Sequence, residues 1–92
     1  MSDAPISRDV TIVNQRGLHA RASAKFVQTA SGFEADISVQ KDGISVGGTS
    51  IMGLMMLAAA KGAEIEIQAR GADADAALAA VVALVDGGFG ET

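Results

Sequence analysis

The only histidine of this chain, His19, lies in the segment NQRGLHARASAKF, two residues after Gly17 and two residues before Arg21. An imidazole nitrogen is a nucleophile, and a guanidinium binds phosphate oxygens through several N–H donors. Gly17 permits a turn with positive φ, and the apolar spacing predicts a helix that begins just after His19. Backbone N–H groups at a helix start bind anions. These residues predict a site at which His19 accepts a phosphoryl group and Arg21 stabilises it.

Other roles are open to a lone histidine. An exposed loop position without function is the plainest alternative. A metal site is disfavoured, because the chain has no cysteine and no second histidine, and positions 10–33 hold no acidic residue. A hydrolase triad is unsupported, since only Ser23 lies close to His19 as a nucleophile. Ser, Thr, Asp and Asn are absent from positions 17–20, so we expect the first helical amides to have no side-chain cap.

The acidic residues are unevenly distributed along the chain. The formal net charge is −4, yet positions 10–33 and 43–63 contain no acidic residue. Two such segments fit sites that receive negative charge, because carboxylates would repel it. The overall sign argues against nucleic-acid binding. With 92 residues and no long apolar run, we expect one domain, 1–92, cytoplasmic and monomeric, with no membrane contact, cofactor or metal.

Ser50 marks a second candidate site in the segment GGTSIMGLMMLAAAKG. A hydroxyl residue before a helix is a typical N-cap, so we expect Ser50 or Thr49 to cap this helix. An exposed cap hydroxyl in an acid-free segment also tolerates phosphorylation, which makes Ser50 a candidate regulatory site. Met52 and the pair Met55-Met56 exceed what one buried stripe needs. We expect core filling for part of them, with an adaptable contact surface as the alternative for Met52 at least.

Alternating apolar residues predict four strands with one buried face, in segments 8–14, 34–40, 43–47 and 63–70. The buried positions expected on them are Val10, Ile12, Ile37, Val39, Ile44, Val46, Ile65, Ile67 and Ala69. Asp42-Gly43 predicts a tight turn between the second and third strands.

Helical spacing predicts three helices, from near Ala20 to Gly32, from near Ser50 to Gly62, and from about Ala74 to Gly87. Their expected apolar faces are Ala20, Ala24 and Val27; Ile51, Leu54, Met55 and Ala58; and Ala77, Leu78, Val81 and Val85. The order β-α-β-β-α-β-α predicts a two-layer α/β sandwich with a mostly antiparallel sheet.

The segment GLHARASAKF followed by GGTSIMGLMMLAAAKG resembles HPr, the family of histidine-containing phosphocarriers of the phosphoenolpyruvate-dependent phosphotransferase system. The resemblance extends from about Arg8 to Val85. It implies an open-faced β-sandwich of α+β type, in which three helices cover one face of a four-stranded antiparallel sheet. It also implies that His19 receives a phosphoryl group on Nδ1 from phosphorylated enzyme I and passes it to an enzyme IIA-type domain. Arg21 would neutralise the phosphate.

The same resemblance implies roles for the second segment. Ser50 matches the serine that HPr kinase/phosphorylase modifies in some bacteria, and Ala20, Ile51, Met52 and Met55 match the apolar partner surface. The protein would then be a cytoplasmic phosphoprotein of sugar transport, a carrier with a transient phosphohistidine rather than an independent enzyme. The sugar-transport and nitrogen-regulatory branches share this fold and site, so the branch stays open.

Two positions depart from the family pattern. Ala22 stands where many relatives have proline, and Thr49 stands where a basic residue is common. The first change reduces rigidity in the first helical turn but keeps the donors, and the second weakens electrostatic recognition of partners. The alternative function is a non-carrier regulatory module that binds proteins through the helix of Ser50 and Met52, with His19 incidental. An acyl carrier is disfavoured, because such carriers are helical bundles and this chain predicts four strands.

Overall fold

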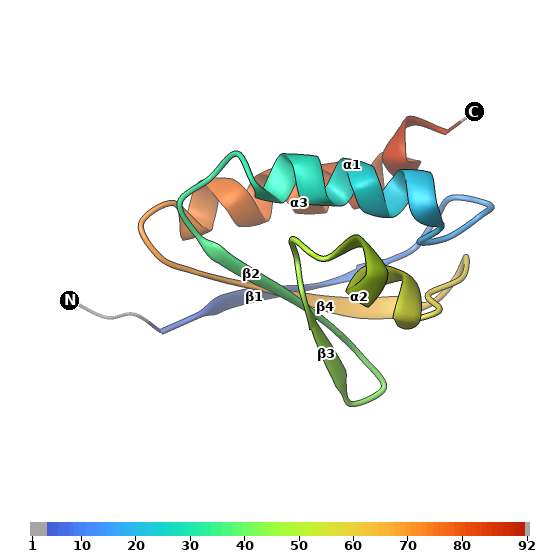
Figure 1. The fold of residues 1–92 in the computed structure, drawn as a ribbon, viewed down its shortest axis with the longest axis horizontal. Helices are drawn as coiled ribbons and strands as arrows, with labels where there is room; N and C mark the ends of the chain where they lie inside the picture. The colour runs from blue at the N-terminus through green and yellow to red at the C-terminus, as the bar shows by residue number, and fades with distance from the viewer. Residues whose placement is uncertain (1–3, 92) are drawn as a thin grey trace.

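The fold is a four-stranded antiparallel sheet with helices packed on one face. The computed structural model describes residues 4–91. Its elements are β1 (Ile6–Thr11), α1 (Ala20–Ala30), β2 (Asp36–Lys41), β3 (Ile44–Gly47), α2 (Ile51–Met56), β4 (Glu64–Arg70), α3 (Ala74–Asp86) and a short 3₁₀ helix η1 (Gly88–Gly90). The strands lie in the order β1-β4-β2-β3. Helices α1 and α3 run side by side above the sheet, and α2 packs beside α1 and β3 (Figure 1). The predicted order and the open-faced sandwich are confirmed.

The apolar residues of neighbouring strands meet on the helix-covered face of the sheet. Val39 of β2 pairs with Ile67 of β4, and Val10 of β1 pairs with Ile65 on the other side of β4. All four side chains are buried. Full burial of one such side chain contributes roughly 1.5–3 kcal/mol. The core positions predicted for the first, second and fourth strands are therefore confirmed.

The prediction for the third strand is wrong at one position. Ile44 is 53% exposed, and Val46 is only partly buried. Strand β3 pairs with β2 alone, and its hairpin extends beyond the helices that cover the rest of the sheet (Figure 1). The alternation of residues in β3 is that of a strand, but little of the strand lies over the core.

Helix α1 presents a different face to the core than predicted. Its buried residues are Ala22, Ser23, Phe26 and Ala30. The predicted stripe is exposed at Ala20 and only partly buried at Ala24 and Val27. Phe26 is fully buried and is the largest apolar side chain of the helix, so its burial sets the orientation. Alanines occur all around this helix, which made the apolar spacing a weak guide to its face.

Helix α2 is shorter than predicted and ends at Met56 rather than near Gly62. Ala58 has φ of +52°, which takes the chain out of the helical conformation. The segment that follows is bonded instead to Ile12, the residue just after β1. The N–H of Gly62 donates to the carbonyl of Ile12 at 2.7 Å, and the N–H of Ile12 donates to the carbonyl of Ala63 at 2.9 Å. The loop after α2 is thereby fixed beside the loop that leads to His19.

Predictions for the third helix and for the hairpin turn are confirmed. The buried residues of α3 are Ala77, Leu78, Val81, Val82 and Val85. Asp42 and Gly43 both have positive φ, as a two-residue turn between β2 and β3 requires. Even α3, with 13 residues, is short, and within residues 4–91 no helix is long and apolar enough to cross a membrane.

Candidate functional site

His19 is the N-cap residue of α1. Its backbone is extended, and its carbonyl accepts the first helical hydrogen bond from the N–H of Ser23 at 2.9 Å. The ring folds back over the helix start, where Nδ1 accepts a hydrogen bond from the backbone N–H of Arg21 at 3.2 Å. The expectation that no side chain caps this helix is wrong. The imidazole itself takes the position that a serine or aspartate oxygen usually occupies.

Gly17 fixes the loop that carries His19. Its φ is +64°, and a Cβ at this position would lie 2.3 Å from the carbonyl oxygen of Ala59 and 2.9 Å from Cα of Ala60. The next N–H, of Leu18, donates to the same Ala59 carbonyl at 2.9 Å. Glycine is therefore needed both for the positive φ and for the close approach of two backbones. His19 projects from a loop that is bonded directly to the loop after α2.

A carboxylate absent from the sequence prediction meets the ring on its other side. Oε1 of Glu91 is hydrogen-bonded to Nε2 of His19 and also accepts from Nδ2 of Asn14 at 3.1 Å. The hydrogen bond with His19 lowers the pKa of Glu91 below its ordinary value of 4.5, and Asn14 and Arg16 act in the same direction against partial desolvation. The expectation that no acidic residue lies near His19 is thus wrong. Positions 10–33 contain no acidic residue, but the far end of the chain supplies one.

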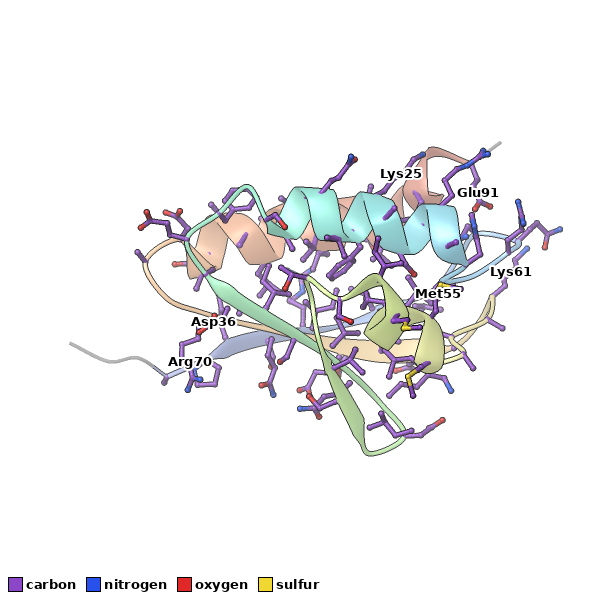
Figure 2. The ribbon with its side chains drawn as sticks, in the orientation of Figure 1. Lys25, Asp36, Met55, Lys61, Arg70 and Glu91 are labelled. Carbon is purple, nitrogen blue, oxygen red and sulfur yellow. The ribbon has the colours of Figure 1, made fainter. Side chains whose placement is uncertain are left out.

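The turn η1 brings Glu91 to the site. Phe89 has φ of +57° and is 1% exposed, so it anchors this turn in the core. Nζ of Lys25, on α1, donates to the carbonyl of Phe89 at 2.7 Å. Figure 2 shows Lys25 and Glu91 at the same end of α1. The only sequence signal for this arrangement is one aromatic residue between glycines just after α3, and nothing local connects it with His19.

An open hollow of about 310 Å³ lies beside the ring, and basic side chains line much of it. Its lining residues are Arg16, His19, Arg21, Lys25, Gly90 and Glu91. Within residues 4–91 the guanidinium of Arg21 has no hydrogen bond or ion pair, so it is available to an anion. The hollow has three basic side chains and a single carboxylate, that of Glu91, so its net charge is positive. Such a charge suits the binding of a phosphoryl group. Among residues 4–91 no group of three or more His, Cys, Asp or Glu residues could hold a metal ion.

Ser50 is the N-cap residue of α2. Its Oγ accepts a hydrogen bond from the N–H of Gly53 at 2.9 Å, and the residue is exposed. The predicted cap is confirmed, and it is Ser50 rather than Thr49.

The predicted partner surface is exposed and lies on α2 and the start of α1. The exposed fractions on α2 are 42% for Ile51, 76% for Met52, 43% for Met55 and 75% for Met56. Ala20 is exposed at the start of α1, which packs against α2, and Figure 2 shows Met55 on the outside of α2. We call Ala20 with these four residues the α2 patch. The expectation that part of these methionines fill the core is wrong, since Leu54 alone is buried on this helix.

Comparison with known proteins identifies the family. The model described as "PTS HPr component phosphorylation site" matches residues 6–86. The chain belongs to the HPr family. The phosphocarrier protein HPr of Neisseria meningitidis serogroup A is 52% identical over 86 residues, which cover 94% of this chain and 97% of that protein. The phosphocarrier protein NPr of Escherichia coli K12 is 39% identical over 87 residues, with the same two coverages. The crystal structure of an HPr from Thermoanaerobacter tengcongensis superposes with a TM-score of 0.90 at 42% identity, covering 95% of this chain and 98% of that one.

Membership of the HPr family makes this chain a phosphocarrier of the phosphotransferase system, which interacts with enzymes of that system. The two departures from the family pattern lie in different surroundings. Ala22 is 1% exposed in the first turn of α1, so its side chain packs in the core. Thr49 is exposed immediately before α2. Only Thr49 is therefore positioned to change what a partner contacts.

Proposed function

We propose that His19 is the phosphoryl acceptor, which takes the group on Nδ1 from phosphorylated enzyme I and passes it to an enzyme IIA-type domain. The observation that carries this proposal is the contact between Nδ1 and the backbone N–H of Arg21 at 3.2 Å. It directs the nucleophilic nitrogen toward the positive end of α1. The basic hollow of Arg16, Arg21 and Lys25 lies beside the same ring.

Transfer to Nδ1 needs only a small rearrangement at the helix start. The Nδ1 lone pair that accepts from Arg21 N–H becomes the attacking pair, so this hydrogen bond breaks when the N–P bond forms. The freed N–H then donates to a phosphoryl oxygen, and the guanidinium of Arg21 neutralises the charge. Donors fixed in place before the reaction stabilise the transferred group without reorganisation.

The test is incubation with enzyme I and labelled phosphoenolpyruvate. Because relatives include proteins named HPr and NPr, enzymes I from the sugar and nitrogen-regulatory branches are both used. A label on wild type that acid removes and base does not, and that is absent from His19→Ala, supports the carrier assignment. Absence of label with every enzyme I favours the interaction module instead.

We also propose that Ser50 is a regulatory phosphorylation site and that the α2 patch is where enzymes of the system dock. Ser50 is exposed and borders the patch at Ile51, so a phosphate there would lie at the edge of the docking surface. HPr kinase/phosphorylase is the modifying enzyme that the family suggests. We expect the protein to act as a monomer.

A further inference from the structure

Both ring nitrogens of His19 have a partner, and the two partners differ in kind. Nδ1 faces a donor, the backbone N–H of Arg21, and Nε2 faces an acceptor, the carboxylate of Glu91. A nitrogen that accepts a hydrogen bond carries a lone pair, and one that donates carries the proton. The two contacts together assign the proton to Nε2 and the nucleophilic pair to Nδ1.

Glu91 is itself held in place from several sides. Nδ2 of Asn14 donates to its Oε1 at 3.1 Å and to the carbonyl of Gly17 at 2.9 Å, so one amide links the carboxylate to the loop of His19. Asn14 is 5% exposed, which restricts its side chain. The backbone N–H of Glu91 donates to the carbonyl of Gly88 at 3.0 Å, behind the buried Phe89. A carboxylate fixed in this way can orient a ring.

We propose that Glu91 is a positioning residue that selects the nitrogen of His19 to be phosphorylated. It does so by holding the Nε2 proton and by keeping anionic phosphoryl donors away from Nε2. This inference rests on the proposed role of His19 as phosphoryl acceptor. The carboxylate of Glu91 is ionised at neutral pH, as the role requires, and its contact with His19 moves its pKa further below that range.

The bonds and charges of the phosphoryl transfer balance without movement of a proton. The Nδ1 pair forms the bond to phosphorus, and the bond between phosphorus and its leaving group breaks, with the electron pair departing on that group. The ring keeps its Nε2 proton and gains one positive charge, which the carboxylate of Glu91 balances. In the reverse direction the N–P bond breaks and its pair returns to Nδ1. Arg16, Arg21 and Lys25 line the same hollow.

A phosphoryl donor that needs no partner protein tests this inference. Phosphoramidate transfers its phosphoryl group to imidazole and releases ammonia, and phosphorus and nitrogen NMR distinguish the Nδ1 product from the Nε2 product. We expect the wild type to be labelled on Nδ1 only. Glu91→Ala should give a mixture with the Nε2 product and react at Nδ1 roughly tenfold more slowly, because a charge-assisted contact is lost.

Matched variants separate orientation from charge. Glu91→Gln keeps an acceptor oxygen of the same reach but lacks the charge, so it should retain selectivity for Nδ1 while reacting more slowly than wild type. Glu64→Gln removes one carboxylate from an exposed strand position and controls for net charge. Melting curves verify that each variant is folded. Exclusive Nδ1 labelling of Glu91→Ala at the wild-type rate would overturn the inference.

A second readout keeps this inference apart from the proposed function. The Nε2 proton should give a downfield, slowly exchanging NMR signal in wild type that disappears in Glu91→Ala. Its absence from wild type would overturn the role of Glu91, whatever the phosphoryl chemistry. If the signal and the Nδ1 selectivity behave as expected while no enzyme I phosphorylates the protein, only the assignment of enzyme I as donor fails.

Discussion

Gly17 lies so close to Ala59 that a Cβ on Gly17 would be 2.3 Å from the Ala59 carbonyl oxygen. We therefore expect Gly17→Ala to lose stability through two effects. The positive φ costs about 1–2 kcal/mol for any residue with a Cβ, and the clash adds to it by separating two bonded loops. Gly43→Ala is the matched control, since Gly43 has φ of +81° but nothing within 4 Å of a Cβ. Urea unfolding of both variants checks this, and equal losses would show that the close approach costs nothing.

Replacement of His19 should abolish phosphoryl acceptance and cost little stability. His19→Ala removes the cap of α1, so we expect the free energy of unfolding to fall by about 1 kcal/mol. His19→Asn keeps a capping oxygen and should recover part of that loss without restoring the label. Labelling by enzyme I, together with a thermal melt, measures both effects. A labelled His19→Ala variant would assign the phosphoryl group to another residue.

Arg21→Ala should keep a slower transfer. The backbone N–H of Arg21 remains, and only the guanidinium is lost. A charge-assisted contact contributes about 1.5–3 kcal/mol, which corresponds to a rate lower by roughly tenfold to a hundredfold. Transfer rates in both directions check this, with Arg8→Ala on the exposed side of β1 as the control for charge. Rates equal to those of the control would make Arg21 an ordinary surface cation.

Phosphate on Ser50 should slow phosphorylation of His19 without unfolding the domain. The group adds about −1.5 to −2 charges at the start of α2, where the helix dipole favours them. Docking of enzyme I on the α2 patch would then require desolvation of a strongly hydrated group. Ser50→Asp should show a weaker form of this effect. Ser50→Thr keeps the hydroxyl cap and should react like wild type, and a rate loss that follows the melting temperature would instead indicate a purely structural role.

The contribution of Glu91 to stability should depend on pH in one direction. Its pKa in the folded protein is below the ordinary value of 4.5, so the unfolded chain binds more protons in this range. The stabilisation that Glu91 provides is fully present above the ordinary pKa of 4.5, and it is lost as the pH falls through the lowered pKa of the folded protein. Melting temperatures of wild type and Glu91→Gln should therefore differ at about pH 6 and converge toward about pH 3. A difference of the same size at both pH values would contradict this assignment.

Most of the fold could be predicted because its signals are local. Strand alternation in 63–70, the Asp42-Gly43 turn and the spacing in α3 each lie within a few residues, and the structure confirms them. Where the local signal was weak, the prediction failed. Alanines occur on several faces of α1, and nothing within the second helix indicates that it ends at Met56. After that end Ala58 has positive φ, and Gly62 is bonded to Ile12, a residue distant in the sequence.

Only part of the candidate site could be predicted from the sequence. His19, Arg21 and Ser50 stand beside glycines and helix starts, where sequence reasoning is informative. Glu91 lies 72 positions from His19 and reaches it through a turn held by a buried aromatic residue and a lysine. Such an arrangement depends on tertiary packing, for which this single sequence carries no periodic or motif signal.

The pairing of β1 with β4 bears on the order in which the molecule folds. Ile6 pairs with Ala69 and Thr11 with Glu64. The segment between the two strands is more than half of the chain, and it must close as a loop before β1 can pair with β4. Hairpin β2–β3 closes over two residues and can form in microseconds, whereas contacts between distant segments form late. The loop with His19 leaves directly from β1. We therefore expect a chain that has formed only the hairpin and the helices to lack a competent phosphoryl site, so that competence for labelling marks the end of folding.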